Sequence, residues 1–275
     1  MTLEMETTRF RDERRLKRLS VAILLIVMTL NVSASRKLLG QKAGESALSE
    51  SDRLETNTVE ANVDDRYVQA QQRMVEVHLK GRDINNEKVL EAMGDVSRHE
   101  FVRPPLRHLS YRDSPLPIGA GQTISQPYIV ALMTQLADPR PGDKALDIGT
   151  GSGYQAAILS KLVDKVYSIE IVESLAKEAK GRLEELGYKN VEVRHGDGYA
   201  GWQAHAPFDV IIVAAAPDHV PPALIDQLAP GGKLVIPVGD RIQSLFVIEK
   251  GEDGKVKRRE VIPVRFVPMT GAAEE

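Results

Sequence analysis

The second half of the chain alternates between short apolar runs and longer stretches with a helical spacing of apolar positions. Strand-like runs occupy residues 144–148, 165–170, 191–194, 208–213 and 232–237, and helical patterns occupy residues 154–163, 173–186 and 219–229. Repeated units of a strand followed by a helix are typical of an open, mostly parallel sheet with helices on both faces. The pattern therefore predicts an α/β fold.

Two further apolar runs lie near the C-terminus, at residues 244–248 and 261–267. They flank residues 251–255, a charged segment that contains two glycines. Glycine and acidic residues between two strand-like runs indicate a hairpin turn. We therefore expect an antiparallel pair of strands at the end of the sheet.

A helical spacing also begins near residue 67, ahead of the predicted sheet. Apolar residues recur at Met74, Val75 and Leu79, and again at residues 89, 90 and 93. Positions three and four apart lie on one face of a helix. The pattern predicts a helical segment at the start of a folded domain that covers residues 67–275.

Residues 35–66 have a different composition, rich in Ser, Glu, Asp, Asn and Lys and without an aromatic residue. Such a segment cannot bury enough apolar surface to offset the entropy of ordering its backbone. We expect a flexible linker that the folded domain does not need.

The first 34 residues combine a basic stretch with an apolar run over residues 21–28. The run is too short for an unaided membrane span, but its length and the Val-Ser-Ala sequence at residues 32–34 fit a secretory signal or an anchor. The acidic residues Asp12 and Glu13 do not suit such a signal, so a fortuitous amphipathic helix and an unused upstream start codon remain open. Membrane contact is expected only through residues 9–34, if they are retained.

Composition narrows the classes of function. The 275 residues carry 36 Lys and Arg against 39 Asp and Glu, a formal net charge of -3, so no overall positive field favours nucleic acid as a partner. The absence of cysteine excludes disulfide scaffolds, cysteine nucleophiles and thiolate metal sites. The histidines show no metal-ligand spacing, and no metal is expected.

A glycine-rich turn stands where the first predicted strand meets its helix, with the sequence Asp-Ile-Gly-Thr-Gly-Ser-Gly at residues 147–153. Alternate glycines let a ligand approach the backbone at the sheet edge where doubly wound folds bind nucleotide-like cofactors. Glu170, at the end of the second strand, can accept hydrogen bonds from both ribose hydroxyls of an adenosine. The alternatives are tight packing for the turn and a solvated strand-end carboxylate for Glu170.

The spacing of these glycines separates the cofactor classes. Dinucleotide-binding domains usually read G-x-G-x-x-G, whereas this chain reads G-x-G-x-G with Asp147 two residues ahead. That variant resembles the S-adenosyl-L-methionine (AdoMet)-dependent methyltransferases and disfavours an NAD-dependent oxidoreductase. Downstream, Asp197 lies in a Gly-Asp-Gly sequence where an acidic side chain can meet an adenine amino group, although an Asp-Gly turn is the alternative.

The loop at residues 119–128 precedes the predicted sheet and concentrates hydroxyl and amide side chains between glycines and a proline. Polar side chains gathered on a loop favour a binding role. The same residues also fit a helix N-cap at Ser125 or Gln126 with Pro127 at the first helical position. Both interpretations stay open from the residues alone.

Several of these segments together resemble the protein-L-isoaspartate O-methyltransferase family, from about residue 70 to residue 271. They are residues 121–128, 147–156, 196–199, 206–213 and 266–271. The resemblance implies a class I AdoMet-dependent methyltransferase fold, which is Rossmann-like with a mostly parallel seven-stranded sheet and a helical N-terminal segment. Ala214 stands where the family commonly has threonine, and residues 1–65 have no counterpart in the family core.

The same resemblance assigns roles to individual residues. Ser125 is implied as the catalytic serine. The implied cofactor-binding positions are Gln122, Thr123, Ile124, Ser125, Gly149, Gly151, Glu170, Asp197, Gly198 and Thr270.

By resemblance, the reaction is methyl transfer from AdoMet to the free carboxylate of L-isoaspartyl residues in damaged proteins, a step in protein repair. A carboxylate with a pKa near about 4 is ionised at neutral pH and needs no general base. The alternatives are a methyltransferase for another acceptor and a protein that binds AdoMet without catalysis. An Asn or Asp-Pro-Pro-Tyr element, common in N-methyltransferases, is missing at residues 214–217, which read Ala-Ala-Ala-Pro.

The cofactor and the family resemblance also imply a location in the cell and a set of partners. AdoMet is a cytosolic metabolite and the family is usually cytoplasmic, so we expect cytoplasmic residence over a periplasmic or membrane-anchored location. The expected partners are isoaspartyl-containing proteins and peptides, with no nucleic acid, and the expected state is a monomer.

Overall fold

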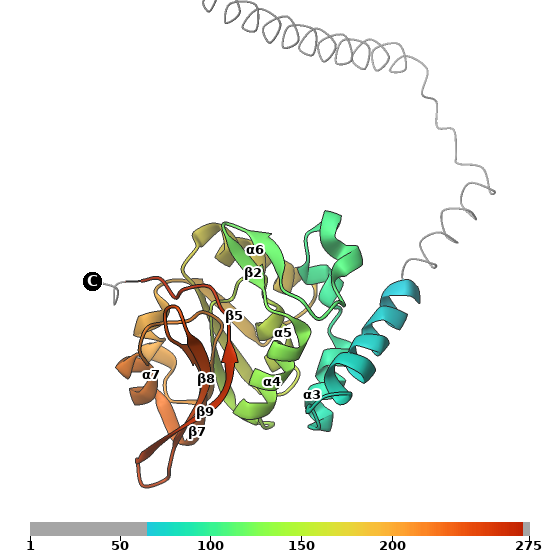
Figure 1. Cartoon of the computed structure of the whole chain (residues 1–275). Helices are drawn as coiled ribbons and strands as arrows, with labels where there is room; N and C mark the ends of the chain where they lie inside the picture. The colour runs from blue at the N-terminus through green and yellow to red at the C-terminus, as the bar shows by residue number, and fades with distance from the viewer. Residues whose placement is uncertain (1–64, 272–275) are drawn as a thin grey trace, which may run out of the picture. The chain divides into compact units, whose positions relative to one another are not determined.

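The computed structural model of the chain describes residues 65–271 (Figure 1). The expected signal or anchor at residues 1–34 lies outside the described residues, as does the expected linker up to residue 64. Within residues 65–271, no helix has both the length and the apolar content that a membrane span requires.

Helices form the first part of the described chain, as the spacing of apolar residues predicts. A small hairpin follows that was not predicted, and its second strand lies within residues 119–128, which were expected as a loop. Residues 65–73 are α-helical and continue into the π-helical stretch η1. The side chain of Asn86 starts the next helix by accepting a hydrogen bond from the N–H of Val89 at 3.3 Å. The elements in this part are η1 (Met74–Lys80), α3 (Glu87–Asp95), η2 (Arg98–Phe101), η3 (Pro104–Leu109), β1 (Leu116–Gly119), β2 (Gln122–Ile124) and α4 (Pro127–Ala137).

A seven-stranded sheet in the order β5-β4-β3-β6-β7-β8-β9 forms the centre of the domain (Figure 1). The strands from β5 to β7 run parallel, and β8 and β9 are antiparallel to their neighbours. The strands are β3 (Lys144–Ile148), β4 (Lys165–Glu170), β5 (Val191–His195), β6 (Phe208–Val213), β7 (Leu228–Val238), β8 (Gln243–Lys250) and β9 (Val256–Val264). The sheet confirms the predicted class I methyltransferase architecture.

Successive strand residues point to opposite sides of the sheet, so the sheet has an apolar core on each face. Helices cover both of these cores. Within β3, Ala145 belongs to the core beneath α4, α5 (Tyr154–Ser160) and α6 (Glu173–Glu185), whereas Leu146 belongs to the core on the other face. That second core contains Trp202 and Leu224, which come from the segments around η4 (Gly198–Ala200), η5 (Gln203–His205) and α7 (Pro222–Asp226).

The boundaries of some predicted elements were wrong. The helix expected at residues 219–229 is confined to α7, because Pro221 and Pro222 open it and β7 already begins at Leu228. The last strand spans residues 256–264 rather than 261–267. The turn expected at residues 251–255 does join β8 to β9.

The segment after β9 leaves the sheet edge and returns beside the end of β6. Ala216 donates its N–H to the carbonyl of Val267 at 2.9 Å, and Met269 donates its N–H to the carbonyl of Ala216 at 2.8 Å. This short parallel bridge brings residues 267–270 to the carboxyl ends of the central strands, where β3 and β4 also end.

Candidate active site

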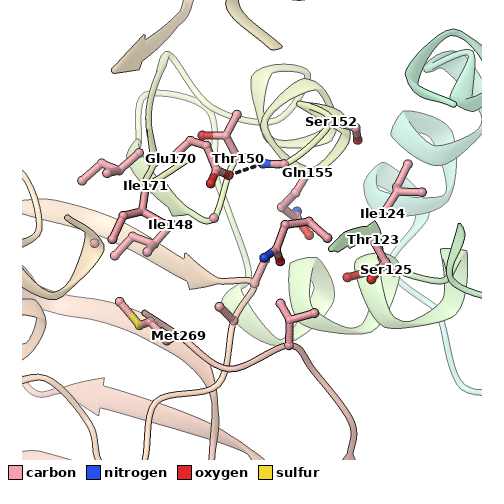
Figure 2. A pocket seen from close by; sticks show the side chains of 18 of the residues that line it. Thr123, Ile124, Ser125, Ile148, Thr150, Ser152, Gln155, Glu170, Ile171 and Met269 are labelled. Atoms are coloured by element: carbon pink, nitrogen blue, oxygen red, sulfur yellow. Dashed lines mark hydrogen bonds between the residues drawn. The ribbon is translucent and has the colours of Figure 1, made fainter. Parts of the chain in front are cut away.

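A cavity lies at the carboxyl ends of β3, β4 and β6 and holds about 880 Å³ of empty space, part of it open to solvent. Figure 2 shows Thr123, Ile124 and Ser125 on one side and Glu170 and Ile171 on the opposite side. All but one of the expected site residues line it: Gln122, Thr123, Ile124, Ser125, Gly149, Gly151, Glu170, Gly198 and Thr270.

The glycine-rich turn and Glu170 form one hydrogen-bonded unit. The carboxylate of Glu170 accepts the N–H of Gly151 at 2.7 Å and the N–H of Val172 at 2.9 Å (Figure 2). Gly151 has a φ of 53°, in the left-handed region that glycine adopts without strain. Each carboxylate oxygen has a second lone pair, so Glu170 can hold the turn and still accept from a ligand hydroxyl.

Asp147 supports this turn from inside the domain. It is fully buried, and its Oδ2 accepts a hydrogen bond from the hydroxyl of Ser168 at 2.7 Å. Ser168 in turn lies 2.6 Å from the hydroxyl of Thr150 in the turn. Burial raises the pKa of Asp147 to about 7, although the hydrogen bond from Ser168 acts in the opposite direction.

Ser125 stands between β2 and α4, at the mouth of the cavity. The N-cap position of α4 is Gln126, with Pro127 first in the helix, and the Gln126 side chain makes no capping hydrogen bond. The hydroxyl of half-buried Ser125 makes no hydrogen bond to any residue of the described range. The observed geometry therefore leaves this hydroxyl available to a ligand and does not use it as a helix cap.

Asp197 is the expected site residue that does not line the cavity. Its Oδ1 accepts the N–H of Tyr199 at 2.8 Å and so caps the short helix η4. The neighbouring Gly198 is buried and does line the cavity, and a Cβ there would lie 2.4 Å from the side chain of Ile148. A side chain at residue 198 would force the cavity wall to shift.

Several lining residues were not found from the sequence. Ile171 directly follows Glu170, and its position after the strand-end acid is a signal that could have found it. Gln155, from the first turn of α5, donates its amide N–H to the hydroxyl of Thr134 at 3.0 Å. Local patterns give no such signal for Met133 and Ala215, because the fold alone brings α4 and the end of β6 to this cavity.

A second, wider groove adjoins the cavity and shares Thr123, Ser125 and Ala214 with it. One side is formed by residues around Tyr128 at the start of α4, and the other by residues 262–268. The groove encloses about 1610 Å³ of empty space, including open solvent. Ser125 therefore stands where the cavity meets a larger and more open groove.

Comparison with known proteins agrees with this geometry. A family model described as protein-L-isoaspartate(D-aspartate) O-methyltransferase matches residues 69–274. The chain belongs to this family. The match confirms the resemblance found in residues 121–128 and the other segments.

Individual relatives and one solved structure are similar over most of the folded domain. Protein-L-isoaspartate O-methyltransferase 2 of a Polaromonas species is 55% identical over 193 residues, 70% of this chain and 92% of the relative. The Gloeobacter violaceus protein-L-isoaspartate O-methyltransferase is 53% identical over 199 residues, 72% of this chain and 97% of the relative. A Plasmodium falciparum protein-L-isoaspartate O-methyltransferase, solved in complex with S-adenosyl-L-homocysteine, has a TM-score of 0.64 and 28% identity and covers 73% of this chain and 98% of its own.

One departure from the family pattern lies in the cavity wall. Ala214, at the end of β6, contacts the glycine-rich turn, since a Cβ built on Gly149 would lie 3.6 Å from the Cβ of Ala214. This is an ordinary van der Waals distance. The small side chain is therefore compatible with the turn that the family uses.

Proposed function

We propose that this chain is an AdoMet-dependent protein-L-isoaspartate O-methyltransferase whose active site is the cavity between the glycine-rich turn and the loop of Ser125. The observation that carries this assignment is the junction at Ser125. There, a cavity with a nucleoside-type acceptor, Glu170, adjoins a larger and more open groove and shares Ser125 with it.

The cavity suits the parts of AdoMet in turn. The carboxylate of Glu170 is an acceptor for ribose hydroxyls, and half-buried Ile171 beside it offers an apolar surface to the adenine. The glycines of residues 149–153 leave the backbone open to the amino-acid portion. Asp197 adjoins the adenine end of the cofactor in this proposal. Its side chain caps η4 and is outside the cavity lining.

When bound, AdoMet supplies a methyl group carried on a positively charged sulfur. The acceptor carboxylate is already ionised at neutral pH, so the chain needs no general base to activate it. The residues present contribute positioning and exclusion of water instead. The Ser125 hydroxyl can donate a hydrogen bond to one carboxylate oxygen and so aim the other oxygen at the cavity.

The open groove suits the polypeptide that carries the isoaspartyl residue. Its two walls, the start of α4 and residues 262–268, come together at Ser125. A peptide lying between them would place the free α-carboxylate of its isoaspartyl residue at the cavity mouth. Methylation converts that carboxylate into an ester, from which the following backbone nitrogen can displace the methoxy group to form a succinimide and release methanol. Hydrolysis of the succinimide returns part of the damaged population to normal aspartyl linkage.

The chemical class of the product tests this assignment. Labelled AdoMet and an isoaspartyl peptide should give a labelled peptide that loses its label as volatile methanol at alkaline pH, because methyl esters hydrolyse there. A label that stays on the peptide in base would indicate methylation of nitrogen and would contradict the proposed acceptor.

Replacement of Ser125 by alanine should lower kcat about tenfold while AdoMet affinity stays within about twofold, because the lost hydrogen bond matters most when the carboxylate is aligned. Water can enter the open groove and replace part of the contact, so a larger loss is not expected. Steady-state kinetics and calorimetry on one preparation measure both quantities.

A matched control is Ser160→Ala, which removes a half-buried serine that donates to the carbonyl of Ala157 outside both cavities. It should leave kcat unchanged. If Ser125 were only a helix cap, Ser125→Ala would instead lower the free energy of unfolding by about 1 kcal/mol and keep the specific activity of the parent protein.

We also propose that the enzyme works as a monomer in the cytoplasm, where AdoMet is made, and that residues 1–34 do not direct it elsewhere. The proposal rests on the cofactor requirement. Cell fractionation with mass spectrometry of the native N-terminus checks it. A mature chain that begins near Ser35 in a periplasmic fraction would overturn the location without changing the assigned reaction.

A further inference from the structure

Arg98, in the short helix η2, is a fully buried charged residue outside both cavities. Its Nε donates a hydrogen bond to the carbonyl of Ser110 at 2.7 Å. Its Nη2 donates to the main-chain carbonyl of Ser125, also at 2.7 Å. One guanidinium group therefore joins a buried loop to the residue at which the cavity and the groove meet.

Arg98 forms no salt bridge with a carboxylate of the described residues, although Asp113 favours its charged form from a longer distance. Among residues 65–271, no carboxylate lies within ion-pair distance of it, and its Nη1 atom, which is buried, has no hydrogen-bond acceptor. An arginine stays protonated in proteins, and an unpaired buried charge carries a large desolvation penalty. Burial accordingly lowers the pKa of Arg98 from its usual value, while the neighbouring Tyr154 opposes that change.

The guanidinium also contacts a second residue of the cavity wall, Tyr154. Its carbon atom lies 4.7 Å from the centre of the Tyr154 ring. Tyr154 is the first residue of α5, directly after the glycine-rich turn, and it lines the cavity. Arg98 is thus in contact with the element that carries the turn and with the loop that carries Ser125.

We propose that Arg98 is a positioning residue for methyl transfer, which rests on the proposed function: it fixes the Ser125 carbonyl against the wall of Tyr154 so that the Ser125 hydroxyl faces the acceptor. Because the planar guanidinium donates to the carbonyls of Ser110 and Ser125 at once, it holds the loop of Ser125 in a fixed position beside Tyr154. Its unpaired positive charge, one hydrogen bond behind Ser125, also favours an anionic acceptor at the mouth of the cavity. Arg98 does not itself touch the acceptor.

Two substitutions separate the geometry from the charge. Arg98→Met keeps most of the apolar volume and removes both hydrogen bonds and the charge. It should lower kcat for an isoaspartyl peptide by about tenfold to a hundredfold and raise the peptide KM, with AdoMet affinity within about twofold of the parent protein. Arg98→Lys keeps the charge but cannot reach two carbonyls in the same geometry, so it should restore the peptide KM and leave kcat about tenfold low.

A control for lost stability is available in the same part of the domain. Buried Gln71 donates to the carbonyls of Met93 at 3.2 Å and Val96 at 2.9 Å and accepts from the hydroxyl of Tyr111 at 3.1 Å, so it makes no hydrogen bond to Ser125 or Arg98. Gln71→Met should lower the midpoint of thermal unfolding as the Arg98 variants do, yet keep kcat per folded molecule. Folded molecules are counted by the stoichiometry of S-adenosyl-L-homocysteine binding.

The outcomes distinguish a failure of the proposed function from a failure of the positioning role of Arg98. A parent protein that does not methylate the isoaspartyl peptide contradicts the proposed function itself. A parent protein that is active, together with an Arg98→Lys variant that folds and keeps the parent kcat, overturns the positioning role. If Arg98→Met does not fold, Arg98→Lys alone decides the matter, because a tenfold loss of kcat at unchanged AdoMet affinity is not expected from a change in stability.

Discussion

Replacement of Glu170 by alanine is expected to weaken AdoMet binding by about 1 to 3 kcal/mol, or about fivefold to 150-fold, with little change in the peptide KM. The ribose hydroxyls lose their acceptor. The N–H groups of Gly151 and Val172 lose theirs as well, so the glycine-rich turn is released and the midpoint of thermal unfolding should fall. Calorimetry and thermal melts measure the two effects.

Two variants complete this experiment. Glu170→Gln keeps one acceptor oxygen but not the charge and should lie between the parent protein and the alanine variant. Glu173→Ala removes an exposed carboxylate three residues further on, at the start of α6, and should bind AdoMet normally. Unchanged AdoMet affinity in a folded Glu170→Ala protein would remove Glu170 from the cofactor site.

The buried carboxyl of Asp147 is expected to make the free energy of unfolding depend strongly on pH. Its pKa is raised to about 7 in the folded protein, above the ordinary value of about 3.9 for an unfolded chain. Between these two pH values the folded state holds a proton on Asp147 that the unfolded state releases. The stabilising contribution of protonated Asp147 is therefore complete below about pH 4, decreases as the pH rises, and is lost above about pH 7. The full change is up to about 4 kcal/mol.

Asp147→Asn cannot titrate and should lack this dependence, so the free energy of unfolding of the parent protein should fall relative to the variant between about pH 4.5 and 7.5. Chemical denaturation across this range measures the difference. Asp164→Asn, which changes an exposed carboxylate just before β4, should follow the parent protein. Parallel curves for the parent protein and Asp147→Asn would mean that this carboxyl is not buried as described.

The sequence predicted the cofactor side of the site well because its signals are local. Glycines between a strand and a helix, and an acid at the end of the next strand, define positions relative to a parallel sheet before any long-range contact is known. Glu170 and Gly151 accordingly lie together in the structure. Asp197 was a weaker case, since an acid before glycine also caps a turn, and its side chain does cap η4.

Other parts of the site depend on contacts between distant segments and could not be predicted from local patterns. Thr270 was placed by family resemblance, and only the bridge between Ala216 and Pro268 explains why it reaches the cavity. Arg98 lies in a polar stretch that reads as a surface helix. Its burial follows from the carbonyls of Ser110 and Ser125, which are 12 and 27 residues away.

The helix expected at residues 219–229 shows the limit of periodicity. The apolar residues from Leu224 to Leu228 fit helical spacing, yet Leu228 pairs with Phe208 as the first residue of β7. Tertiary pairing decided the structure of a short apolar segment that suits either element. The error does not affect the site, because α7 lies on the opposite face from α4 and α5.

The most direct measurement of the central claim is methyl transfer to two peptides that differ only in one linkage. A peptide with an L-isoaspartyl residue and its aspartyl twin are incubated with the full chain and labelled AdoMet, and the methanol released in base is counted. We predict labelling of the isoaspartyl peptide alone, because only that linkage leaves a free α-carboxylate, bonded directly to Cα, for Ser125 to hold. Equal labelling of both peptides, or of neither, would contradict the assignment.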